Sequence, residues 1–205
     1  TCGLDILGGA GDDFLTGGSA TDSLYGGSGN DTVYGSTGDD FLSGGIGSNT
    51  LDYSGLAQGI SLVLTGADSG TLYLSDGAGH QQFAGFTNFL GTNLADSLWG
   101  DSGDVTLDGG GGNDTLGASG SAVSLAGGEG DDLFELDTAM STGVTIDGGL
   151  GDDTLTYTAS GNSLVLTDLD HVTGVEHIVL AGGDAYAKPW NDLAPDGGAV
   201  TIDGT

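Results

Sequence analysis

The chain of 205 residues contains 30 acidic residues, one lysine and no arginine, which gives a net charge of −29. Nucleic acid and anionic membrane surfaces repel such a polyanion, so we exclude both as partners. The 44 glycines argue against helices, and no apolar run is long enough to span a bilayer, so we expect no direct membrane insertion. The composition predicts a chain that needs cations to become compact.

Residues 8–52 consist of five consecutive nine-residue units with the pattern Gly-Gly-x-Gly-x-Asp-x-U-x, in which U is apolar. The glycines at unit positions 1, 2 and 4 allow positive φ and close approach of backbones, so the first six residues suit a tight turn with converging carbonyls. A three-residue strand follows, and only its middle residue, at position 8, can face a core. The residues at this position are Leu15, Leu24, Val33, Leu42 and Leu51.

The sixth residue of each unit places an oxygen-bearing side chain beside the converging carbonyls. These residues are Asp13, Asp22, Asp31, Asp40 and Asn49. Two units complete one coil, so turns 18 residues apart stack, with residues 13, 31 and 49 on one edge and 22 and 40 on the other. Carboxylates stacked at about 4.8 Å would repel one another without a cation between them. Calcium, which takes six to eight oxygen ligands in flexible geometry, fits this arrangement.

A disordered glycine-rich linker is the alternative that composition alone favours, but a linker has no reason to keep an apolar residue in phase with aspartate. The nine-residue register stops after Leu51. Residues 53–90 keep β-like runs at 60–64, 71–74 and 83–90, separated by glycine-rich turns. We expect this segment to be a longer β excursion packed on the roll.

The nine-residue register returns at Gly91, with a three-residue insertion at 136–138. Position 8 is apolar in every unit: Leu98, Leu107, Leu116, Leu125, Phe134, Ile146 and Leu155. The residue at position 6 alternates between aspartate and valine. Asp96, Asp114, Asp132 and Asp153 occupy one edge, and Val105, Val123 and Val144 occupy the other. We therefore predict a lopsided second roll, in which one edge binds calcium and the other is closed by apolar turns.

The second half of the chain repeats the order of the first half, a roll followed by an excursion. The segment SLVLT, for example, occurs in both excursions, at Ser61–Thr65 and at Ser163–Thr167. This duplication predicts a first roll at 1–52, an excursion at 53–90, a second roll at 91–157, and a second excursion with a terminal half-coil at 158–205. A loop at 184–195 holds Lys188 and Trp190 and suits either a partner contact or a cap over the apolar edge.

We expect no functional site at the single cysteine or at the three histidines. Cys2 cannot form an internal disulfide, and we expect a small side chain in a terminal coil in preference to an attachment point. His80, His171 and His177 lack the partners that a zinc or catalytic site needs, so we expect surface histidines.

The repeat units closely resemble the RTX, or haemolysin-type, calcium-binding repeats of bacterial proteins exported by type I secretion. This resemblance implies an all-β, right-handed parallel β-roll, export of the unfolded chain, and folding outside the cell, where calcium is held by the position-6 side chains and by carbonyls of the glycine region. Besides the nine Asp and Asn residues above, it implies as metal-binding residues Gly9, Gly11, Gly27, Gly29, Gly45, Gly47, Gly110, Gly112, Gly128, Gly130, Gly149 and Gly151. Asn49, Ala20 and the three valines depart from the pattern.

The family is less specific for function than for fold. We favour a calcium-binding structural module of an S-layer, surface filament or adhesin, secreted and located at the cell surface. The alternative is the C-terminal secretion and folding module of a secreted enzyme, such as a lipase, protease or epimerase. No nucleophile elbow, HExxH motif or Ser/His/Asp set is evident, so we expect no enzyme activity in this chain.

The sequence gives less information about partners other than calcium. Residues 3–7 look like the tail of a unit and 199–205 like a strand plus the head of the next, which predicts end-to-end self-association, although a cut from a longer protein would leave the same half-units. A single lysine and no arginine argue against direct binding of an acidic polysaccharide, and a cell-surface polysaccharide remains a possible partner.

Overall fold

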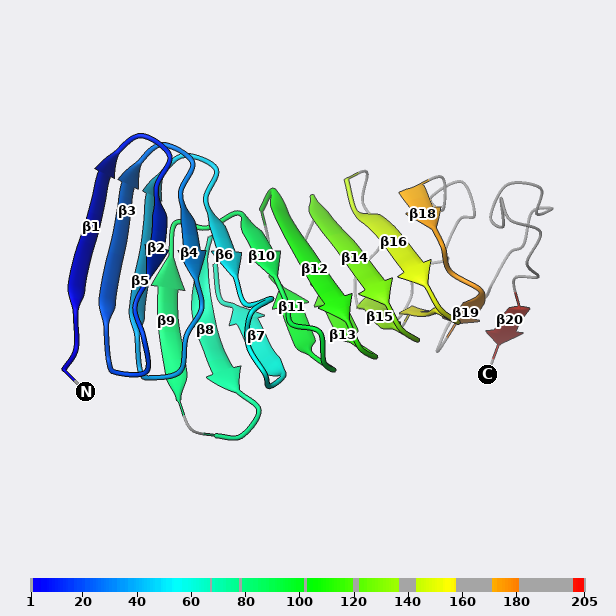
Figure 1. Cartoon of the computed structure of the whole chain (residues 1–205). Helices are drawn as coiled ribbons and strands as arrows, with labels where there is room; N and C mark the ends of the chain where they lie inside the picture. Colours follow the sequence, from blue (N-terminus) through cyan, green and yellow to red (C-terminus); the bar gives the residue numbers. More distant parts are fainter. Residues whose placement is uncertain are drawn as a thin grey trace.

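The computed structural model of the chain is an elongated parallel β-solenoid of about eight turns with essentially no helix (Figure 1). It describes residues 2–66, 68–77, 79–101, 103–119, 122–136, 143–157, 171–180 and 201–204. Within these residues no helix is long and apolar enough to cross a membrane. The predicted fold class is confirmed.

The described strands form two sheets that run along the solenoid. The first has the order β1 (Asp5–Ala10), β3 (Ser23–Ser28), β5 (Phe41–Ile46), β9 (His80–Ala84), β8 (Ser69–Leu74), β7 (Ile60–Leu64), β11 (Ser97–Gly100), β13 (Thr115–Ala118), β15 (Leu133–Leu136), β17 (Thr154–Tyr157), β19 (His177–Leu180) and β20 (Thr201–Gly204). The second has the order β18 (Val172–Thr173), β16 (Thr145–Leu150), β14 (Val123–Glu129), β12 (Val105–Gly111), β10 (Asn88–Leu90), β6 (Thr50–Asp52), β4 (Thr32–Tyr34) and β2 (Phe14–Thr16).

Successive coils pair in parallel with the 18-residue offset that the repeats predict; Leu24, for example, pairs with Leu42. All twelve apolar residues at unit position 8 are buried. Because only one or two apolar side chains per unit are buried, such as Val105 and Leu107 in one unit, each coil contributes a thin apolar layer that only the neighbouring coils can cover. Stability therefore depends strongly on what holds adjacent turns together.

Strand lengths depart from the three residues expected for every unit. Strands β2, β4 and β6 have three residues, whereas β1, β3 and β5 have six and continue through the Gly-Gly-x that follows. The longer strands arise because the glycine backbones of adjacent coils also pair in register, as Gly9 does with Gly27. Strand and turn thus share the first glycines of alternate units.

Strands β7, β8 and β9 of the excursion (residues 53–90) lie within the first sheet and do not form a separate layer on the roll. Strand β8 runs antiparallel to both β7 and β9, and this three-stranded unit joins β5 on one side to β11 on the other. The expected run at 83–90 divides into β9 and β10, which belong to different sheets. The two rolls are consequently one continuous solenoid.

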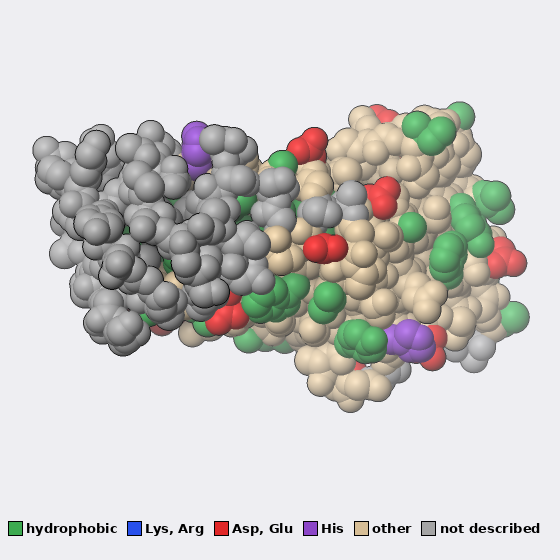
Figure 2. Space-filling view, turned by 180° about the vertical axis from the view of Figure 1, so that it is seen from behind, with side chains coloured by type: hydrophobic (Ala, Val, Ile, Leu, Met, Phe, Trp, Pro, Cys, Tyr) green, Lys and Arg blue, Asp and Glu red, His purple; other side chains and the backbone are tan. Residues whose placement is uncertain are grey.

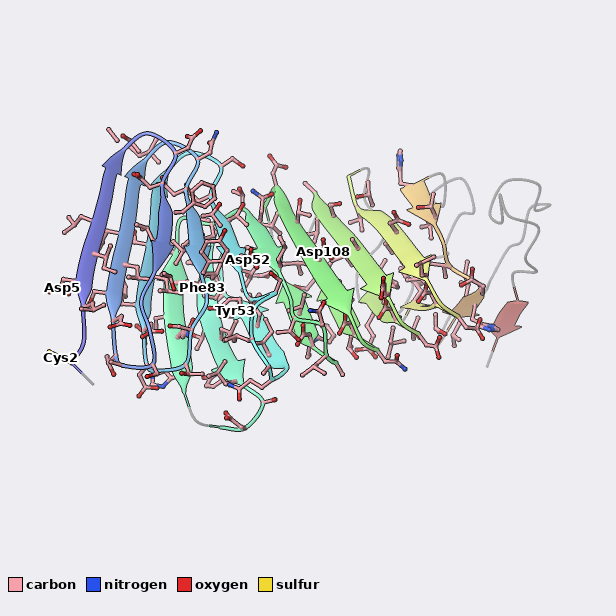
Figure 3. All side chains as sticks on the ribbon, in the orientation of Figure 1. Cys2, Asp5, Asp52, Tyr53, Phe83 and Asp108 are labelled. Carbon is pink, nitrogen blue, oxygen red and sulfur yellow. The ribbon has the colours of Figure 1, made fainter. Side chains whose placement is uncertain are left out.

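The apolar core includes an aromatic cluster at the excursion. Phe83, Phe86 and Phe89 pack together with ring centroids 5.3 to 6.5 Å apart. Tyr53 is also fully buried, and Figure 3 labels it together with Phe83. The predicted second excursion lies mostly outside the described residues, as do Lys188 and Trp190. Strand β19 lies in the described part of this segment and pairs with β17 and β20.

Candidate calcium-binding turns

The residues at unit position 6 stack into two columns along the solenoid. The first column, before the strands of the eight-stranded sheet, contains Asp13, Asp31, Asn49, Thr87, Val105, Val123 and Val144. The second column, before the strands of the twelve-stranded sheet, contains Asp22, Asp40 and Gln81 and, beyond the antiparallel strands, Asp96, Asp114, Asp132, Asp153 and Glu176. The predicted pairing of turns on each edge is therefore found.

Each carboxylate is tied to its neighbour by one of its two oxygens. The backbone N–H of Asp13 donates to Oδ1 of Asp31 at 2.9 Å, and that of Asp22 donates to Oδ1 of Asp40 at 2.8 Å. The same bond joins Asp96 to Asp114, Asp114 to Asp132, and Asp132 to Asp153, at 2.7 to 2.8 Å. Both columns are thus ladders of backbone-to-carboxylate hydrogen bonds.

The other oxygen of most of these carboxylates is buried without a partner. In the described residues, unpartnered Oδ2 atoms occur on Asp13, Asp22, Asp31, Asp114, Asp132 and Asp153. A buried carboxylate oxygen with no donor costs free energy that a hydrogen bond or a cation normally offsets. These six atoms are the strongest structural sign of a cation requirement.

The glycines of the repeat shape the space around these oxygens in two ways. The glycines at positions 2 and 4 have positive φ, as in Gly128 (111°) and Gly130 (128°), and at these two a Cβ would also lie closer than 3.0 Å to the carbonyl oxygen of the glycine one coil earlier. At position 1 the φ is not positive. There a Cβ on Gly127 would collide with Oδ2 of Asp132, so this glycine is required for space.

Burial raises the pKa of several carboxyl groups in the second column in the absence of metal. The pKa of Asp114 rises to about 7, because burial disfavours the charged form and the neighbouring Asp96 and Asp132 add repulsion. Burial likewise raises the pKa of Asp153 to about 6. A divalent cation would reverse this effect by favouring the ionised carboxylates.

The donor set fits calcium. Among the described residues no three His, Cys, Asp or Glu side chains converge, so a bound metal must use backbone carbonyls together with one or two carboxylates. Such hard oxygen ligands suit calcium, whereas zinc prefers nitrogen and sulfur. The ligands would be the unpartnered Oδ2 atoms and the carbonyl groups at positions 2 and 4, and the ion would supply the positive charge that these turns lack.

The structure places most predicted residues as expected and adds others. Val105, Val123 and Val144 are buried, with exposures of 2%, 0% and 3%, so the apolar edge is present. Glu176 was missed, although it stands two residues before the buried Ile178, as Asp153 stands before Leu155. The same spacing of an acidic residue two positions before an apolar one recurs 23 residues after Asp153. This spacing is the signal in the sequence that identifies Glu176.

The histidines and the cysteine lie at the surface. His80 is paired with Asp39 at 3.0 Å and His177 with Asp152 at 2.9 Å, and both pairs are solvent-exposed. Cys2 is exposed and unpaired. Of these described residues, only the backbone of His177 touches a column, through its N–H, which donates to the Asp153 carbonyl at 2.9 Å.

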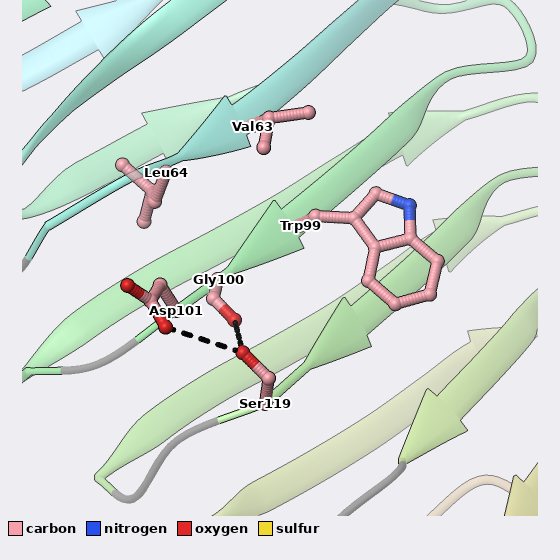
Figure 4. A pocket seen from close by; sticks show the side chains of 6 residues that line it. All are labelled: Val63, Leu64, Trp99, Gly100, Asp101 and Ser119. Atoms are coloured by element: carbon pink, nitrogen blue, oxygen red, sulfur yellow. Dashed lines mark hydrogen bonds between the residues drawn. The ribbon is translucent and has the colours of Figure 1, made fainter.

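A shallow pocket of about 380 Å³ lies on the outer face of the first sheet (Figure 4), lined by Val63, Leu64, Trp99, Gly100, Asp101 and Ser119. The Ser119 hydroxyl donates to Asp101 at 3.3 Å, and the indole N–H of Trp99 donates to Ser97 at 3.1 Å. The pocket combines one aromatic face with exposed polar oxygens.

The comparison with protein-family models identifies the repeats. The model for the RTX calcium-binding nonapeptide repeat matches in four copies, over residues 5–33, 16–51, 90–122 and 144–162. The chain belongs to the RTX calcium-binding repeat family. Its matched segments include eight of the nine predicted position-6 ligands, all but Asp132, and the excursion separates the two groups of RTX repeats.

The comparison with curated protein sequences found no match. Among solved structures, the RTX solenoid is similar to the extracellular lipase LipA from Serratia marcescens, with 17% identity and a TM-score of 0.39. The match covers 94% of this chain but only 35% of the lipase. At that score and identity, the likeness carries no argument about activity.

Proposed function

We propose that this chain is a calcium-operated folding module of an exported protein. The observation that carries the proposal is the pair of columns in which six carboxylates each keep one buried oxygen without a partner. Without calcium these charges oppose folding, and with calcium the same atoms hold adjacent coils together. The low calcium of the cytoplasm would keep the chain extended for export, and the higher calcium outside would fold it.

The direct test compares the chain in EDTA and in millimolar calcium. We expect the far-UV circular dichroism of β-structure and a cooperative melt to require calcium, and magnesium at equal concentration to restore neither. An unchanged spectrum and melting temperature in EDTA would disprove calcium-coupled folding.

We propose that the module serves a larger extracellular protein, and a secreted enzyme is the first host to consider. The family match supports it, since RTX repeats are typical of exported proteins. In that role the chain would contribute folding and secretion while catalysis resides elsewhere. Fusing an unrelated soluble protein to this chain tests it, because calcium should then promote recovery of the fusion partner outside the cell.

A structural role in a surface layer, filament or adhesin is the second candidate, and exposed aromatic side chains favour it. Phe14 is 74% exposed and stacks on Tyr34, and Tyr25 lies 5.8 Å from Phe41 between ring centroids. The two pairs lie on different sheets, and Figure 2 shows exposed hydrophobic side chains on one face of the molecule. Sedimentation velocity in calcium tests self-association, including the end-to-end contact expected from the sequence, and a single monomeric species at all concentrations would exclude this role.

A neutral polysaccharide is a further proposed partner for either host. The Trp99 pocket offers an aromatic face for the C–H surface of a sugar ring and the oxygens of Asp101 and Ser119 for its hydroxyl groups. Retention on an insoluble neutral glucan should fall when Trp99 is replaced by alanine. Equal retention of the two proteins would remove this partner.

A further inference from the structure

The turns that border the excursion differ from the other turns of the two columns. They are the turns of Asp40, Asn49 and Asp96, which the sequence analysis grouped with the calcium ligands. None of these three side chains is among those with an unpartnered Oδ2. In each one, a protein group occupies the place that a cation would take.

At Asp40 a side-chain amide and a hydroxyl donate hydrogen bonds to the second carboxylate oxygen. Oδ2 of Asp40 accepts from the Ser36 hydroxyl at 2.8 Å and from Nε2 of Gln81 at 3.1 Å. Gln81 is fully buried and stands in the column position that follows Asp40, because Phe41 pairs with Gln82. The hydroxyl of Tyr53, also fully buried, donates to Oε1 of Gln81 and fixes the orientation of its amide.

At Asn49 the side chain itself is neutral. Its Oδ1 accepts from the backbone N–H of Asp31 at 2.8 Å, which preserves the ladder. Its Nδ2 donates to the carbonyl of Gly85 at 2.8 Å, where an aspartate would need a cation between two oxygens. Thr87 then follows Asn49 in the column, and its backbone N–H donates to the Asn49 carbonyl at 3.1 Å.

At Asp96 the backbone of the excursion and one threonine satisfy both oxygens. Oδ1 accepts from the N–H of Ile60 at 2.7 Å and from the Thr92 hydroxyl at 3.1 Å. Oδ2 accepts from the N–H of Thr92 at 2.6 Å. Thr92 occupies unit position 2, which is glycine in most other units, so its hydroxyl is a specific addition to this turn.

We propose, building on calcium-coupled folding, that the turns of Asp40, Asn49 and Asp96 bind no calcium. The excursion between them is then a calcium-independent core, which holds the fully buried Tyr53, Phe86 and Phe89 and is bounded by hydrogen bonds alone. The coils on either side, with their unpartnered carboxylates, fold onto this core when calcium is present. The core provides a preformed edge for growth in both directions, which lowers the cost of starting a solenoid.

Amide hydrogen exchange in EDTA and in calcium tests the proposal. We expect the amides of β7, β8 and β9 to remain protected in EDTA, while those of β2, β4, β14 and β16 exchange freely and regain protection with calcium. Rapid exchange of all these strands in EDTA would overturn the core but leave calcium-coupled folding intact. Full protection of all of them in EDTA would instead overturn the proposed function.

Two glutamine-to-glutamate variants on β9 test the role of the Gln81 side-chain amide. Gln81→Glu keeps the shape but removes both donors to the Asp40 turn and places a second carboxylate there. We expect β5 and β9 to lose protection in EDTA and regain it with calcium. Gln82→Glu is the matched control, because Gln82 is the next residue on β9 and is exposed. If the two variants behave alike in EDTA, the donors of Gln81 do not maintain the core and the proposal fails.

Calcium stoichiometry is an independent measurement. Asp40→Asn should leave the number of bound calcium ions unchanged, whereas Asp132→Asn should reduce it by at least one. Equal losses from both variants would show that the Asp40 turn is a metal site. This comparison remains informative even if the Gln81 variant fails to fold.

Discussion

The backbone N–H of Asp114 donates a 2.8 Å hydrogen bond to Oδ1 of Asp132, while Oδ2 of Asp132 is buried with no partner. One oxygen of the same carboxylate therefore maintains the stacking of coils, and the other is available to a metal. The two tasks can be separated by mutation, because asparagine keeps the first oxygen and replaces the second with an amide.

Asp132→Asn should weaken calcium binding while keeping the hydrogen bond from Asp114. With free calcium at about ten times Kd, loss of one site should cost about 1.4 kcal/mol of stability. Asp131→Asn is the control, since Asp131 is exposed and its Oδ1 only accepts from the N–H of Asp152. Calcium titrations followed by calorimetry should show a defect in the first variant alone, and equal affinities would contradict the assignment of Oδ2 as a ligand.

Val105→Asp tests the apolar edge. Val105 is 2% exposed, and its column neighbours Val123 and Thr87 offer no carboxylate to share an ion. The new charge should gain no calcium and should destabilise the fold by burying an unpaired carboxylate. The check is the urea midpoint with the calcium stoichiometry, and an additional bound ion would show that a single carboxylate suffices to build a site on this edge.

Acid should stabilise the calcium-free fold. In that state the pKa values of Asp114 and Asp153 lie at about 7 and about 6, above the ordinary value of 3.8 expected in the unfolded chain. The folded state then binds more protons than the unfolded state between these values, so stability falls as pH rises from about 4 to about 7. Far-UV circular dichroism in EDTA at several pH values measures this, because β-structure that is absent near pH 7 should increase as pH falls, and Asp114→Asn should flatten the dependence.

Protons and calcium should also compete for the same carboxylates. Because Asp114 and Asp153 must ionise to bind metal, calcium affinity should weaken as pH falls below about 7. An affinity independent of pH down to about 5 would show that these two groups do not contribute.

Gly128→Ala should be more damaging than an ordinary glycine substitution. Gly128 has a φ of 111°, and a Cβ would meet the carbonyl oxygen of Gly110. We expect a loss of more than about 1 kcal/mol in calcium, measured by thermal unfolding. Gly9→Ala shares the positive φ without any atom near the new Cβ, and Gly55→Ala has neither feature. The order of stability should be Gly55→Ala, then Gly9→Ala, then Gly128→Ala, and any other order would contradict the steric account.

The repeats could be read from the sequence because local pattern and tertiary contact coincide in a solenoid. A residue such as Leu24 repeats every nine positions and meets its own equivalent in the next coil, so periodicity alone predicts the pairing with Leu42. The column positions and the buried valine edge follow from the same rule. For the glycines at position 1 the predicted close approach of backbones is found but the positive φ is not, and the collision with the aspartate oxygen could not be foreseen because it depends on the side-chain conformation.

The excursion could not be read in this way, because its contacts join residues without a common period. Nothing in the nine-residue pattern places Gln81 beside Asp40, 41 positions away, or Gly85 beside Asn49. The sequence by itself determined the coil, its inward face and the oxygen-rich turns, since these depend on residues repeated at one spacing. Only the tertiary structure decided which carboxylates keep an unpartnered oxygen, since that depends on hydrogen-bond donors brought in by antiparallel strands from elsewhere in the chain.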